Sequence, residues 1–486
     1  MDKKIGEIKF NSKKVGFCRF RKIDDKYLVT NDIGRYVFLS PNLFEQFMEG
    51  SLDENSKTYQ ELEQNEFIRN SLDKKTLVEK YRRRNSFVFQ GPSLHIVVVT
   101  LRCNHKCIYC QASSRDLREK GYDMDIATAR KAVDTVFRSP SKAITIEFQG
   151  GEPLVNWPVV KFIVEYARKK NERAKKSLFI ALVSNFSLLT EERYKFLDRN
   201  RVIFCTSLDG PEELHNKNRP WSGGNSYKVT ASWIKKITKN QKEDSSLYHL
   251  SALLTVSKFS LKYPREIIDT YLKLELSGIH LRPLSFLGLS GKMRSMVGYS
   301  TEEFLKFWRK AMDYIIDLNL KGKIFYERGS RIILSKILTD QDPNFLDLRS
   351  PCGAGIGQML YNYNGKVYTC DEGRMIGDDT FMIGDVKKNN YKEMVSHDTV
   401  KSICIASLLD NLPCDNCVYK PYCGVCPVLN YALYGDIFTS LSHNERCKLH
   451  RGIFDYLFEK LQNEKIKDIF RGWVEPKINY EKIPSN

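Results

Sequence analysis

Three cysteines within eight residues are the group best suited to chemistry in this sequence. Cys103, Cys107 and Cys110 are spaced C-x3-C-x2-C, directly after the apolar run 94–101, whose β-branched residues predict a buried strand. Three thiolates can face one point, which is one fewer than the four that close a structural zinc or iron–sulfur site. The loop is therefore predicted to hold a metal group with one open coordination position.

With Tyr109 just before the third cysteine, this spacing after a first strand resembles the signature of radical S-adenosylmethionine (SAM) enzymes. The resemblance implies that Cys103, Cys107 and Cys110 hold a [4Fe–4S] cluster, with SAM chelating the fourth iron and Tyr109 close to the cofactor. In that family the cluster reduces SAM, and the resulting 5′-deoxyadenosyl radical removes a substrate hydrogen. From the residues alone, a zinc knuckle completed by His105 or another ligand is the alternative.

Strands and helices alternate from about residue 93 to residue 340, which predicts a parallel sheet. The candidate strands are 94–101, 143–148, 178–183, 202–207, 248–256 and 279–284. Six such units suit a partial (β/α)6 barrel, which is also the fold that the resemblance implies. In barrels of this kind the active site lies where strands end and loops begin.

Polar residues follow several of these strands. After the second comes Gln149-Gly150-Gly151-Glu152, where the glycines would let a ligand approach the backbone and the carboxylate would accept hydrogen bonds from an ammonium group. Alone this is an ordinary turn, but in this position it resembles the motif that holds the SAM amino group. Ser184, Asn185 and Ser207, at the ends of the third and fourth strands, are candidate contacts for the ribose and carboxylate of SAM, although such residues also form turns and caps.

The run Ser207-Leu208-Asp209-Gly210-Pro211, followed by His215-Asn216 and Arg219, resembles a segment of radical SAM enzymes that carry a SPASM domain. Arg219 is then a candidate partner for the SAM carboxylate. Cys205 is expected to be a core thiol, and His105 and His280 are interpreted as hydrogen-bonding residues without a catalytic role.

Seven more cysteines lie in the C-terminal third: Cys352, Cys370, Cys414, Cys417, Cys423, Cys426 and Cys447. Two C-x2-C pairs would suit zinc, but seven thiols exceed what one tetrahedral ion binds. The arrangement resembles the SPASM domain, which carries one or two auxiliary [4Fe–4S] clusters. The resemblance implies an outer cluster on Cys414, Cys417, Cys423 and Cys447, and an inner cluster on Cys352, Cys370 and Cys426.

The chain departs from the SPASM pattern in two places. Two residues, where the family often has three, separate Cys423 from Cys426, and Gln358 ends a glycine-rich stretch where the family often has a further cysteine. The inner cluster is therefore expected to have an open iron site. Recruitment of Cys404 is the alternative, but Cys404 lies in an apolar helical stretch and is more simply a core residue, as is Cys18.

Length and composition set the broad class. The 486 residues suggest two or three domains, and 42% apolar with 28% charged residues indicates a globular protein. No apolar run approaches the ~18 residues that span a bilayer, and the first residues lack the apolar core of a signal peptide, so a cytoplasmic location without membrane contact is expected. Thirteen cysteines, an odd number, then favour metal or cluster binding over disulfides. Lys and Arg exceed Asp and Glu by 18 (77 minus 59), but the excess is dispersed and RNA-binding signatures are absent, so nucleic acid is not the expected partner.

Four segments are expected: a small α+β unit (1–90), the barrel (91–340), the SPASM domain (341–455) and a C-terminal tail (456–486). In the first, strands at 15–21, 26–31 and 35–39 precede helices at 41–49 and 58–66, with a tight turn at 31–34. Small winged-helix domains that bind leader peptides have this order, and a structural cap explains it equally well. Residues 74–84 are expected to form an exposed helix.

The stretches 102–114 and 27–36 look like the B-type maturase of His-Xaa-Ser peptide systems. That resemblance implies modification of a ribosomally made peptide, alongside a second radical SAM maturase and with an external electron donor. Three alternatives remain open: a sulfatase-type maturase that oxidises Cys or Ser to formylglycine, an RNA-modifying radical enzyme, and a non-catalytic zinc-bound peptide scaffold.

Overall fold

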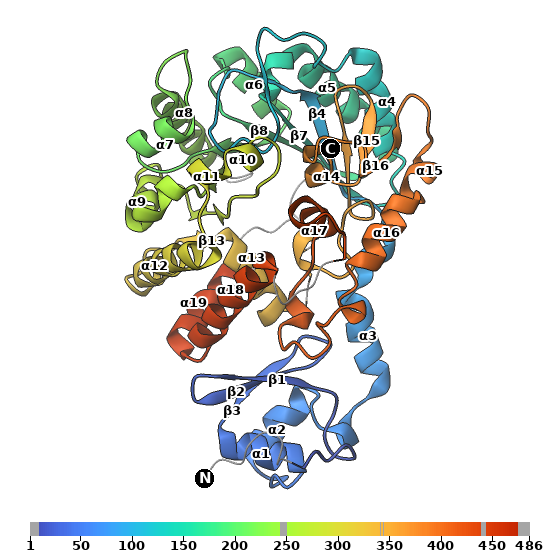
Figure 1. The fold of residues 1–486 in the computed structure, drawn as a ribbon, viewed down its shortest axis with the longest axis vertical. Helices are drawn as coiled ribbons and strands as arrows, with labels where there is room; N and C mark the ends of the chain where they lie inside the picture. The colour runs from blue at the N-terminus through green and yellow to red at the C-terminus, as the bar shows by residue number, and fades with distance from the viewer. Residues whose placement is uncertain (1–8, 244–249, 341, 344, 439–443, 475–486) are drawn as a thin grey trace.

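The computed structural model describes residues 9–243, 250–340, 342–343, 345–438 and 444–474. A small N-terminal unit lies at one end of the molecule, below a larger body in Figure 1. It contains an antiparallel sheet in the order β1-β2-β3, followed by three helices. The bounds are β1 Arg19–Ile23, β2 Lys26–Thr30, β3 Tyr36–Leu39, α1 Pro41–Glu49, α2 Lys57–Gln64 and α3 Lys74–Arg84.

Local sequence explains the start and end of these first elements. Gly34 has a positive φ of 78° in the turn between β2 and β3. Ser40 caps α1, Pro41 occupies its first turn, and Gly50 ends it in the left-handed conformation. The predicted order of strands, turn and helices is therefore confirmed, although β1 begins four residues later than expected, at Arg19.

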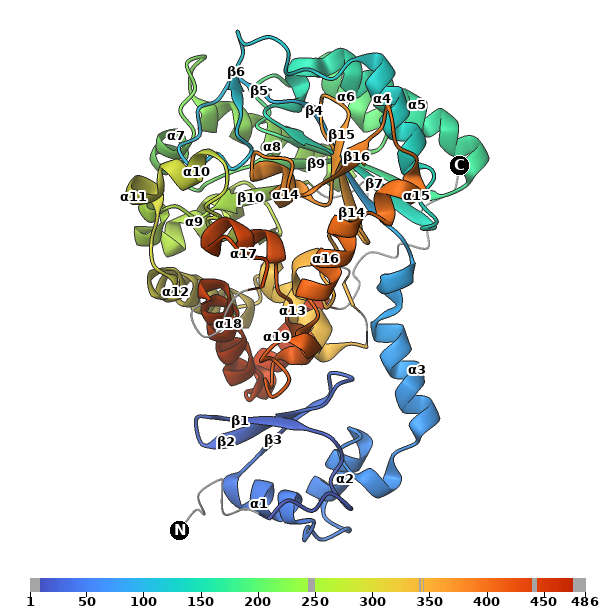
Figure 2. The same ribbon diagram turned by 45° about the vertical axis from the view of Figure 1, so that its right-hand side comes forward.

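The helix α3 connects the small unit to the larger body (Figure 2). It is exposed over most of its length, as expected, but Arg84 at its end is buried. The Arg84 guanidinium donates hydrogen bonds to three backbone oxygens, those of Ile33, Lys336 and Pro421. The expectation of an exposed helix is thus wrong for this residue, because its charged group satisfies carbonyls from three separate segments.

A nine-stranded sheet forms the centre of the larger body, in the order β12-β10-β9-β8-β7-β4-β14-β15-β16. Six of its strands are parallel and come from the predicted alternating region, which confirms the α/β fold. In the described part of the chain the sheet stays open, as a partial barrel requires. The six strands are β4 Leu94–Thr100, β7 Ala143–Gly150, β8 Ser177–Ser184, β9 Val202–Ser207, β10 Ser251–Thr255 and β12 Leu281–Arg282.

Two of the expected strands differ from the structure. The strand expected at 279–284 is divided: β11 (Gly278–Ile279) pairs with β13 (Tyr326–Glu327), and only β12 joins the main sheet. The Glu327 carboxylate accepts a hydrogen bond from the Leu281 backbone N–H (3.1 Å), so a side chain takes the place of a neighbouring strand there. For the strand expected at 248–256, residues 248 and 249 lie outside the described residues.

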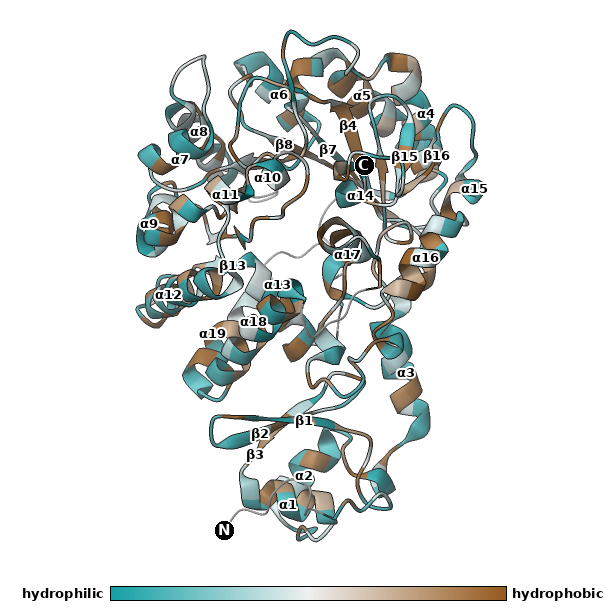
Figure 3. Ribbon diagram, viewed as in Figure 1, coloured by the Kyte–Doolittle hydropathy of each residue, from teal (hydrophilic) through white to brown (hydrophobic). Residues whose placement is uncertain are grey.

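The outer face of the parallel strands is covered by helices, and β4 is buried on both faces. Val97 and Val99 belong to the large core beneath the helices, whereas Ile96 and Val98 pack with Leu360 on the other side. Figure 3 shows the hydrophobic colour along β4. The helices of this region are α4 Ile126–Val136, α5 Trp157–Ala174, α6 Glu191–Arg199, α7 Glu212–Asn218, α8 Ser226–Glu243, α9 Pro264–Lys273, α10 Leu289–Lys292, α11 Arg294–Val297, α12 Thr301–Leu320 and α13 Arg328–Leu338.

The C-terminal region extends the same sheet. Strand β14 (Gln358–Tyr361) pairs in parallel with β4, and β15 (Lys366–Tyr368) and β16 (Met382–Asp385) follow in antiparallel order. The boundary expected near residue 340 is therefore crossed by strand pairing. The helices are α14 Asp371–Met375, α15 Tyr391–Val395, α16 Asp398–Ala406, α17 Pro427–Tyr434, α18 Glu445–Leu461 and α19 Glu464–Val474.

The boundary expected at residue 455 falls inside α18, and α19 packs beside it, with Phe470 and Trp473 in the main core. Among the helices of the described residues, none is long and apolar enough to cross a membrane. The remaining short elements are β5 Arg102–Cys103, β6 Arg115–Asp116, η2 Arg69–Ser71, η3 Ser86–Phe89, η4 Pro153–Asn156, η5 Lys258–Lys262, η6 Leu346–Leu348, η7 Leu409–Asn411 and η8 Lys420–Tyr422.

Candidate active site and cysteine clusters

The loop with the first three cysteines begins at β5, next to the carboxyl end of β4. It is held against the segment that follows α7: the Lys106 N–H donates to the Pro220 carbonyl (2.9 Å) and the Ile108 N–H to the Asn218 carbonyl (3.0 Å). The His105 ring stacks on Trp221 with centroids 5.4 Å apart and an interplanar angle of 9°. These contacts fix the loop at the strand ends, where the barrel pattern predicts an active site.

The three thiols of this loop lie in one electrostatic environment. Burial raises the pKa of Cys107 to about 12, with the neighbouring Cys110 adding to the rise and Arg219 opposing it. Burial also raises the pKa of Cys103 well above its ordinary value, and Cys107 and Cys110 contribute to that shift. Because thiolates are the ligands of metals, such buried thiols need a positively charged group to become thiolates. The structure thus brings the predicted Cys103, Cys107 and Cys110 together in a setting that suits a metal group.

A charged pair links this loop to the end of β9. The Arg219 Nε lies 3.2 Å from the Asp209 carboxylate, and an Arg219 N–H points at the Cys107 sulfur (3.8 Å). The buried Tyr109 hydroxyl donates to the same Asp209 carboxylate, and the guanidinium lies 5.4 Å from the Tyr109 ring centroid. Arg219, predicted as a SAM contact, is therefore already paired with a residue of the chain. Sequence reasoning assigned no role to Asp209, although it lies in the quoted motif.

The two glycines at the end of β7 are required by the chain itself. A Cβ on Gly150 would lie 2.1 Å from the Thr100 carbonyl oxygen, and one on Gly151 would lie 2.3 Å from the Arg102 carbonyl oxygen. Gly150 also has a positive φ of 132°. The Gly151 N–H donates to the Thr100 carbonyl (2.9 Å). The sequence predicted that these glycines would let a ligand approach the backbone closely. In the structure, the backbone that leads into the cysteine loop makes this close approach instead.

Glu152 lies beneath these glycines and connects β7 to β8. Its carboxylate accepts hydrogen bonds from the Ser184 hydroxyl (2.8 Å), the Asn185 backbone N–H (2.9 Å) and the Leu154 backbone N–H (3.0 Å), and the residue is 1% exposed. Burial raises its pKa, and these bonds oppose the rise. The structure therefore brings together three of the predicted site residues, in contacts that hold two strand ends in place.

The other predicted SAM contacts lie near this edge. Gln149 donates to the Glu147 carboxylate (2.7 Å) on the inner side of β7, and Ser207 is the last residue of β9. His105, interpreted as a hydrogen-bonding residue, contacts the Asn185 amide (2.9 Å) and the Ser226 hydroxyl (2.9 Å). Burial and Arg219 lower the His105 pKa to about 4, so the ring is neutral near pH 7.

Three cysteines of the C-terminal region form one buried cluster. Cys352, Cys370 and Cys426 pack together with Phe381 and Ile403, and both Cys352 and Cys426 contribute to the raised pKa of Cys370. This is the predicted inner set. Cys404 lies on α16, and burial alone raises its pKa, with no contribution from another cysteine. Cys404 packs against the main core, whereas the inner set forms a separate cluster, in agreement with its interpretation as a core residue.

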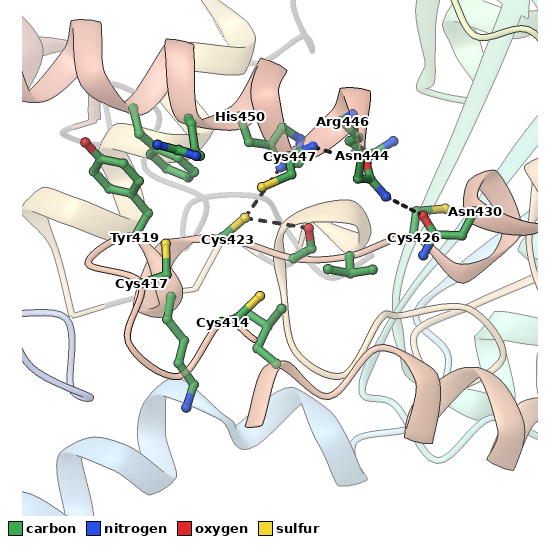
Figure 4. Close-up of a pocket in the computed structure, with 16 residues that line it drawn as sticks. Cys414, Cys417, Tyr419, Cys423, Cys426, Asn430, Asn444, Arg446, Cys447 and His450 are labelled. Atoms are coloured by element: carbon green, nitrogen blue, oxygen red, sulfur yellow. Dashed lines mark hydrogen bonds between the residues drawn. The ribbon is translucent and has the colours of Figure 1, made fainter. Parts of the chain in front are cut away.

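The other four cysteines line a cavity, drawn in Figure 4, and Cys426 of the inner set lies at the same cavity. Three come from the outer cysteine loop (residues 414–423), and Cys447 comes from α18. Burial raises the pKa of Cys414 and of Cys423 to about 12, and the other cysteines of the set add to both shifts. The predicted outer set, Cys414, Cys417, Cys423 and Cys447, is thus brought together around one cavity.

His450 is a lining residue that sequence reasoning missed. Its Nδ1 lies 3.5 Å from the Cys423 sulfur, and the side chain also lines the cavity. Burial lowers its pKa to about 3, so the ring is neutral near pH 7. The available signal was its position three residues after Cys447, which places both side chains on one face of a helix.

All four donors of the outer set are sulfur, the ligand atom of iron–sulfur clusters. Within the described residues, no group of three or more His, Cys, Asp or Glu side chains is arranged to hold a single metal ion. Four thiolates on one zinc would lie about 3.8 Å from one another, since each Zn–S bond is ~2.3 Å. The four outer cysteines line one cavity together with His450. Sulfur donors around one cavity match the ligand chemistry of iron–sulfur clusters.

Comparison with known proteins identifies the family. Residues 97–271 match the model of the Radical SAM superfamily, and this span runs from β4 to α9 and includes the three-cysteine loop. The chain contains a radical SAM domain. Members of this superfamily use a [4Fe–4S] cluster and SAM, so the protein is a SAM-dependent enzyme, and the cysteine-rich C-terminal region fits auxiliary clusters.

Curated relatives of this chain include two that each cover more than two thirds of it. The cysteine-type anaerobic sulfatase-maturating enzyme of Clostridium novyi (strain NT) is 24% identical over 339 residues, covering 68% of this chain and 86% of the relative. The radical SAM cyclopropyl synthase TigE of Paramaledivibacter caminithermalis is 23% identical over 407 residues, 79% of each chain.

Solved structures share the fold. Native anSMEcpe with bound AdoMet superposes with a TM-score of 0.65 at 19% identity, covering 78% of this chain and 99% of that chain. SuiB of Streptococcus suis bound to its precursor peptide SuiA superposes with a TM-score of 0.52 at 13% identity, covering 89% and 98%. The SuiB match extends over more of the chain than the match to anSMEcpe.

Proposed function

We propose that this radical SAM enzyme is a peptide maturase of the kind found in His-Xaa-Ser peptide systems, which modifies a residue of a ribosomally made peptide. The observation that carries the proposal is a contact between the segments that follow two of the three cysteine sets. Arg374, on the helix that begins after Cys370, donates a hydrogen bond to the Ala112 carbonyl (3.0 Å), two residues after Cys110. The inner cysteines therefore lie beside the radical SAM loop, where an auxiliary cluster can serve the reacting residue.

The chemistry of the donors assigns each set a group. Cys103, Cys107 and Cys110 would hold the SAM-binding [4Fe–4S] cluster, and the inner and outer sets would hold the auxiliary clusters. When bound, the first cluster and SAM supply a one-electron cleavage that yields a 5′-deoxyadenosyl radical able to take hydrogen from carbon. The open position expected on the inner set would suit a heteroatom of the substrate.

The remaining site residues position these groups. Arg219 places a positive charge beside Cys107 and thereby favours its thiolate, while Asp209 keeps the guanidinium in place. Glu152, Ser184 and Asn185 hold the strand ends together. We propose that SAM binds along this edge, with Tyr109, Gln149, Gly150, Gly151 and Ser207 completing its surroundings.

A peptide substrate is supported by relatives of the same fold. Solved structures of anSMEcpe contain the Cp18Cys or Kp18Cys peptide, and that of SuiB contains its precursor SuiA. We propose a peptide as the partner of this chain, with an external electron donor and a second radical SAM maturase acting beside it. The N-terminal unit is a candidate for leader-peptide recognition, since a small sheet with following helices suits that task.

Sulfatase maturation is the second candidate, because curated relatives that cover more than two thirds of the chain carry that name. The two functions differ in their product. A formylglycine-forming enzyme removes the sulfur of a substrate cysteine, whereas other peptide maturases can leave every side-chain heteroatom in place. Mass spectrometry of a sulfatase-type cysteine peptide and of a candidate His-Xaa-Ser precursor, each incubated with the reduced enzyme and SAM, distinguishes them.

The first test is the metal content. Iron, acid-labile sulfide and zinc are measured per chain after anaerobic reconstitution, and about twelve irons are expected for three [4Fe–4S] clusters. About four irons together with zinc would make the C-terminal region a structural zinc module and would remove the auxiliary clusters from the mechanism. Colourless, iron-free protein would favour the non-catalytic scaffold instead.

A further inference from the structure

The N-terminal sheet lies directly against the outer cysteine loop. Figures 1 and 2 both show β1 to β3 packed beneath the C-terminal helices and the segment around residues 414–423. Within this loop the only regular element is η8, a single short turn. Its internal backbone hydrogen bonds are those of short turns, such as Cys417 N–H to the Cys414 carbonyl (2.9 Å), so contacts with other parts of the chain help to fix its position.

Arg19 makes the first of these contacts. Its side chain is 2% exposed and forms ion pairs with Asp32 (2.8 Å) on one side and with Asp415 (3.2 Å) on the other. The guanidinium also donates to the Asp415 backbone carbonyl. Asp415 directly follows Cys414. Arg19 thus holds both the side chain and the main chain of a residue adjacent to an outer cysteine.

The other two cysteines of the loop have equivalent neighbours. The Thr30 hydroxyl donates to the carbonyl of Val418 (2.8 Å), which follows Cys417. Next to Cys423, the Tyr422 hydroxyl donates to the Gly34 carbonyl (3.1 Å). Each of the three cysteines is therefore adjacent to a residue that the N-terminal sheet or its turn binds.

The fourth cysteine is held by the same unit through α18. Tyr36 packs edge-on against Phe458 (centroids 5.4 Å apart), and Arg21 pairs with Asp455 (3.1 Å). Both partners lie on α18, the helix that carries Cys447. The sheet thus contacts both the loop and α18, which also pack on each other through Tyr419 and Phe454 (centroids 5.0 Å apart).

We propose that the N-terminal sheet is the scaffold that assembles the outer cluster site, with Arg19 and Thr30 as positioning residues. The proposal rests on the proposed function, in that the four outer cysteines bind an iron–sulfur cluster. Without the sheet, the loop and α18 would keep their cysteines but lose the fixed arrangement of the four sulfurs. Within the described residues, Arg19 and Thr30 do not contact the SAM-binding set or the inner set. These two sets should therefore keep their iron.

The test uses the full chain with Arg19→Ala and Thr30→Val, after anaerobic reconstitution. Thr30→Val keeps the shape of the side chain and removes only the hydroxyl that binds Val418. Lys22→Ala, an exposed residue on the same strand, is the matched control. Cys417→Ala provides the reference for a protein without the outer cluster. Iron, sulfide and the EPR spectrum of the reduced protein are measured, together with the melting temperature.

The expected result for Arg19→Ala is a fall from about twelve irons to about eight, with an EPR spectrum that matches Cys417→Ala. Thr30→Val should lose part of the same signal, and Lys22→Ala none. Twelve irons and an unchanged outer-cluster signal in the folded variants would overturn the proposal. If Arg19→Ala does not fold, Thr30→Val decides alone. Fewer than twelve irons in the unaltered chain would instead count against the proposed function.

Discussion

Arg374 and Ala112 join the two halves of the catalytic region: the Arg374 guanidinium donates to the Ala112 carbonyl at 3.0 Å. The arginine follows Cys370 of the inner set, and Ala112 follows Cys110 of the radical SAM loop. Arg374 is 7% exposed, and burial lowers its pKa. A buried guanidinium at this position fixes the inner set relative to the radical SAM loop.

Replacing Arg374 with Gln should uncouple the two halves. The loss of a buried hydrogen bond from a charged group costs about 1.5 to 3 kcal/mol, so the melting temperature should fall by several degrees. SAM cleavage should continue because the three-cysteine loop is intact, while the ratio of modified peptide to 5′-deoxyadenosine should drop at least tenfold. Replacing the exposed Arg173 on α5 with Gln serves as control. An unchanged ratio would contradict this role for Arg374.

Variants of different cysteine sets should lose different properties of the enzyme. Cys103→Ala should abolish SAM cleavage, because two thiolates cannot hold the SAM-binding cluster. Cys417→Ala should spare uncoupled cleavage and lose about four irons. Both are followed by chromatography of 5′-deoxyadenosine and by iron analysis.

Cys404→Ser is the control for these cysteine variants, since Cys404 lies apart from the inner set on α16. It should keep the full iron content and the peptide-modifying activity. A loss of four irons in Cys404→Ser would mean that the inner cluster recruits this residue and has no open position.

Much of the fold could be predicted because its signals are local. Buried strands such as β9 and the first helix, α1, with Ser40 before it and Gly50 after it, have the expected bounds. The pairing of β14 with β4 could not be predicted, because the two strands are far apart in the chain. The residues of a strand do not specify which other strand pairs with it. For the same reason no local signal indicated that the C-terminal region would extend the barrel sheet.

The candidate site, too, could be predicted only in part from the sequence. The spacing of the cysteines and the family resemblance grouped them into the three sets that the structure brings together. The contacts around them were not accessible: Glu152 resembles a ligand-binding carboxylate until Ser184 and Asn185 of another strand are seen to bind it. Arg19 looks like a surface residue, because Asp415 lies almost 400 positions away in the chain.

Gly151 should not tolerate a side chain. In Gly151→Ala the new Cβ would meet the Arg102 carbonyl oxygen at 2.3 Å and the Leu101 carbonyl oxygen at 2.5 Å, and both belong to backbone that cannot rotate away. Overpacking of this kind costs about 1 to 3 kcal/mol and would displace the start of the cysteine loop. The melting temperature and the iron of the SAM-binding set should both fall. Gly472→Ala on α19, where nothing lies within 4 Å of the added carbon, should leave both unchanged or raise the melting temperature slightly.

Acidification should destabilise the fold through His95 on β4. Its ring is fully buried between the Pro92 carbonyl (3.1 Å) and the Tyr361 hydroxyl (3.2 Å), and burial lowers its pKa to about 3. In the unfolded chain the ring takes up a proton near pH 6.5. Between these two values the unfolded state binds more protons than the folded state. The free energy of unfolding should therefore fall as the pH falls, by up to about 1.4 kcal/mol per pH unit for this residue.

The variant His95→Gln isolates this contribution. Its melting temperature should be lower than that of the unaltered chain at pH 7.5, because the bonds to Pro92 and Tyr361 are weakened, but the difference should shrink as the pH is lowered from 6.5 to 4.5. Melting curves of the reconstituted protein at each pH measure it, and His397→Asn, at an exposed helix N-cap, corrects for effects common to all variants. A difference that stays constant over this range would mean that His95 gains its proton equally in both states, so that burial of the neutral ring contributes nothing to the acid sensitivity of the fold.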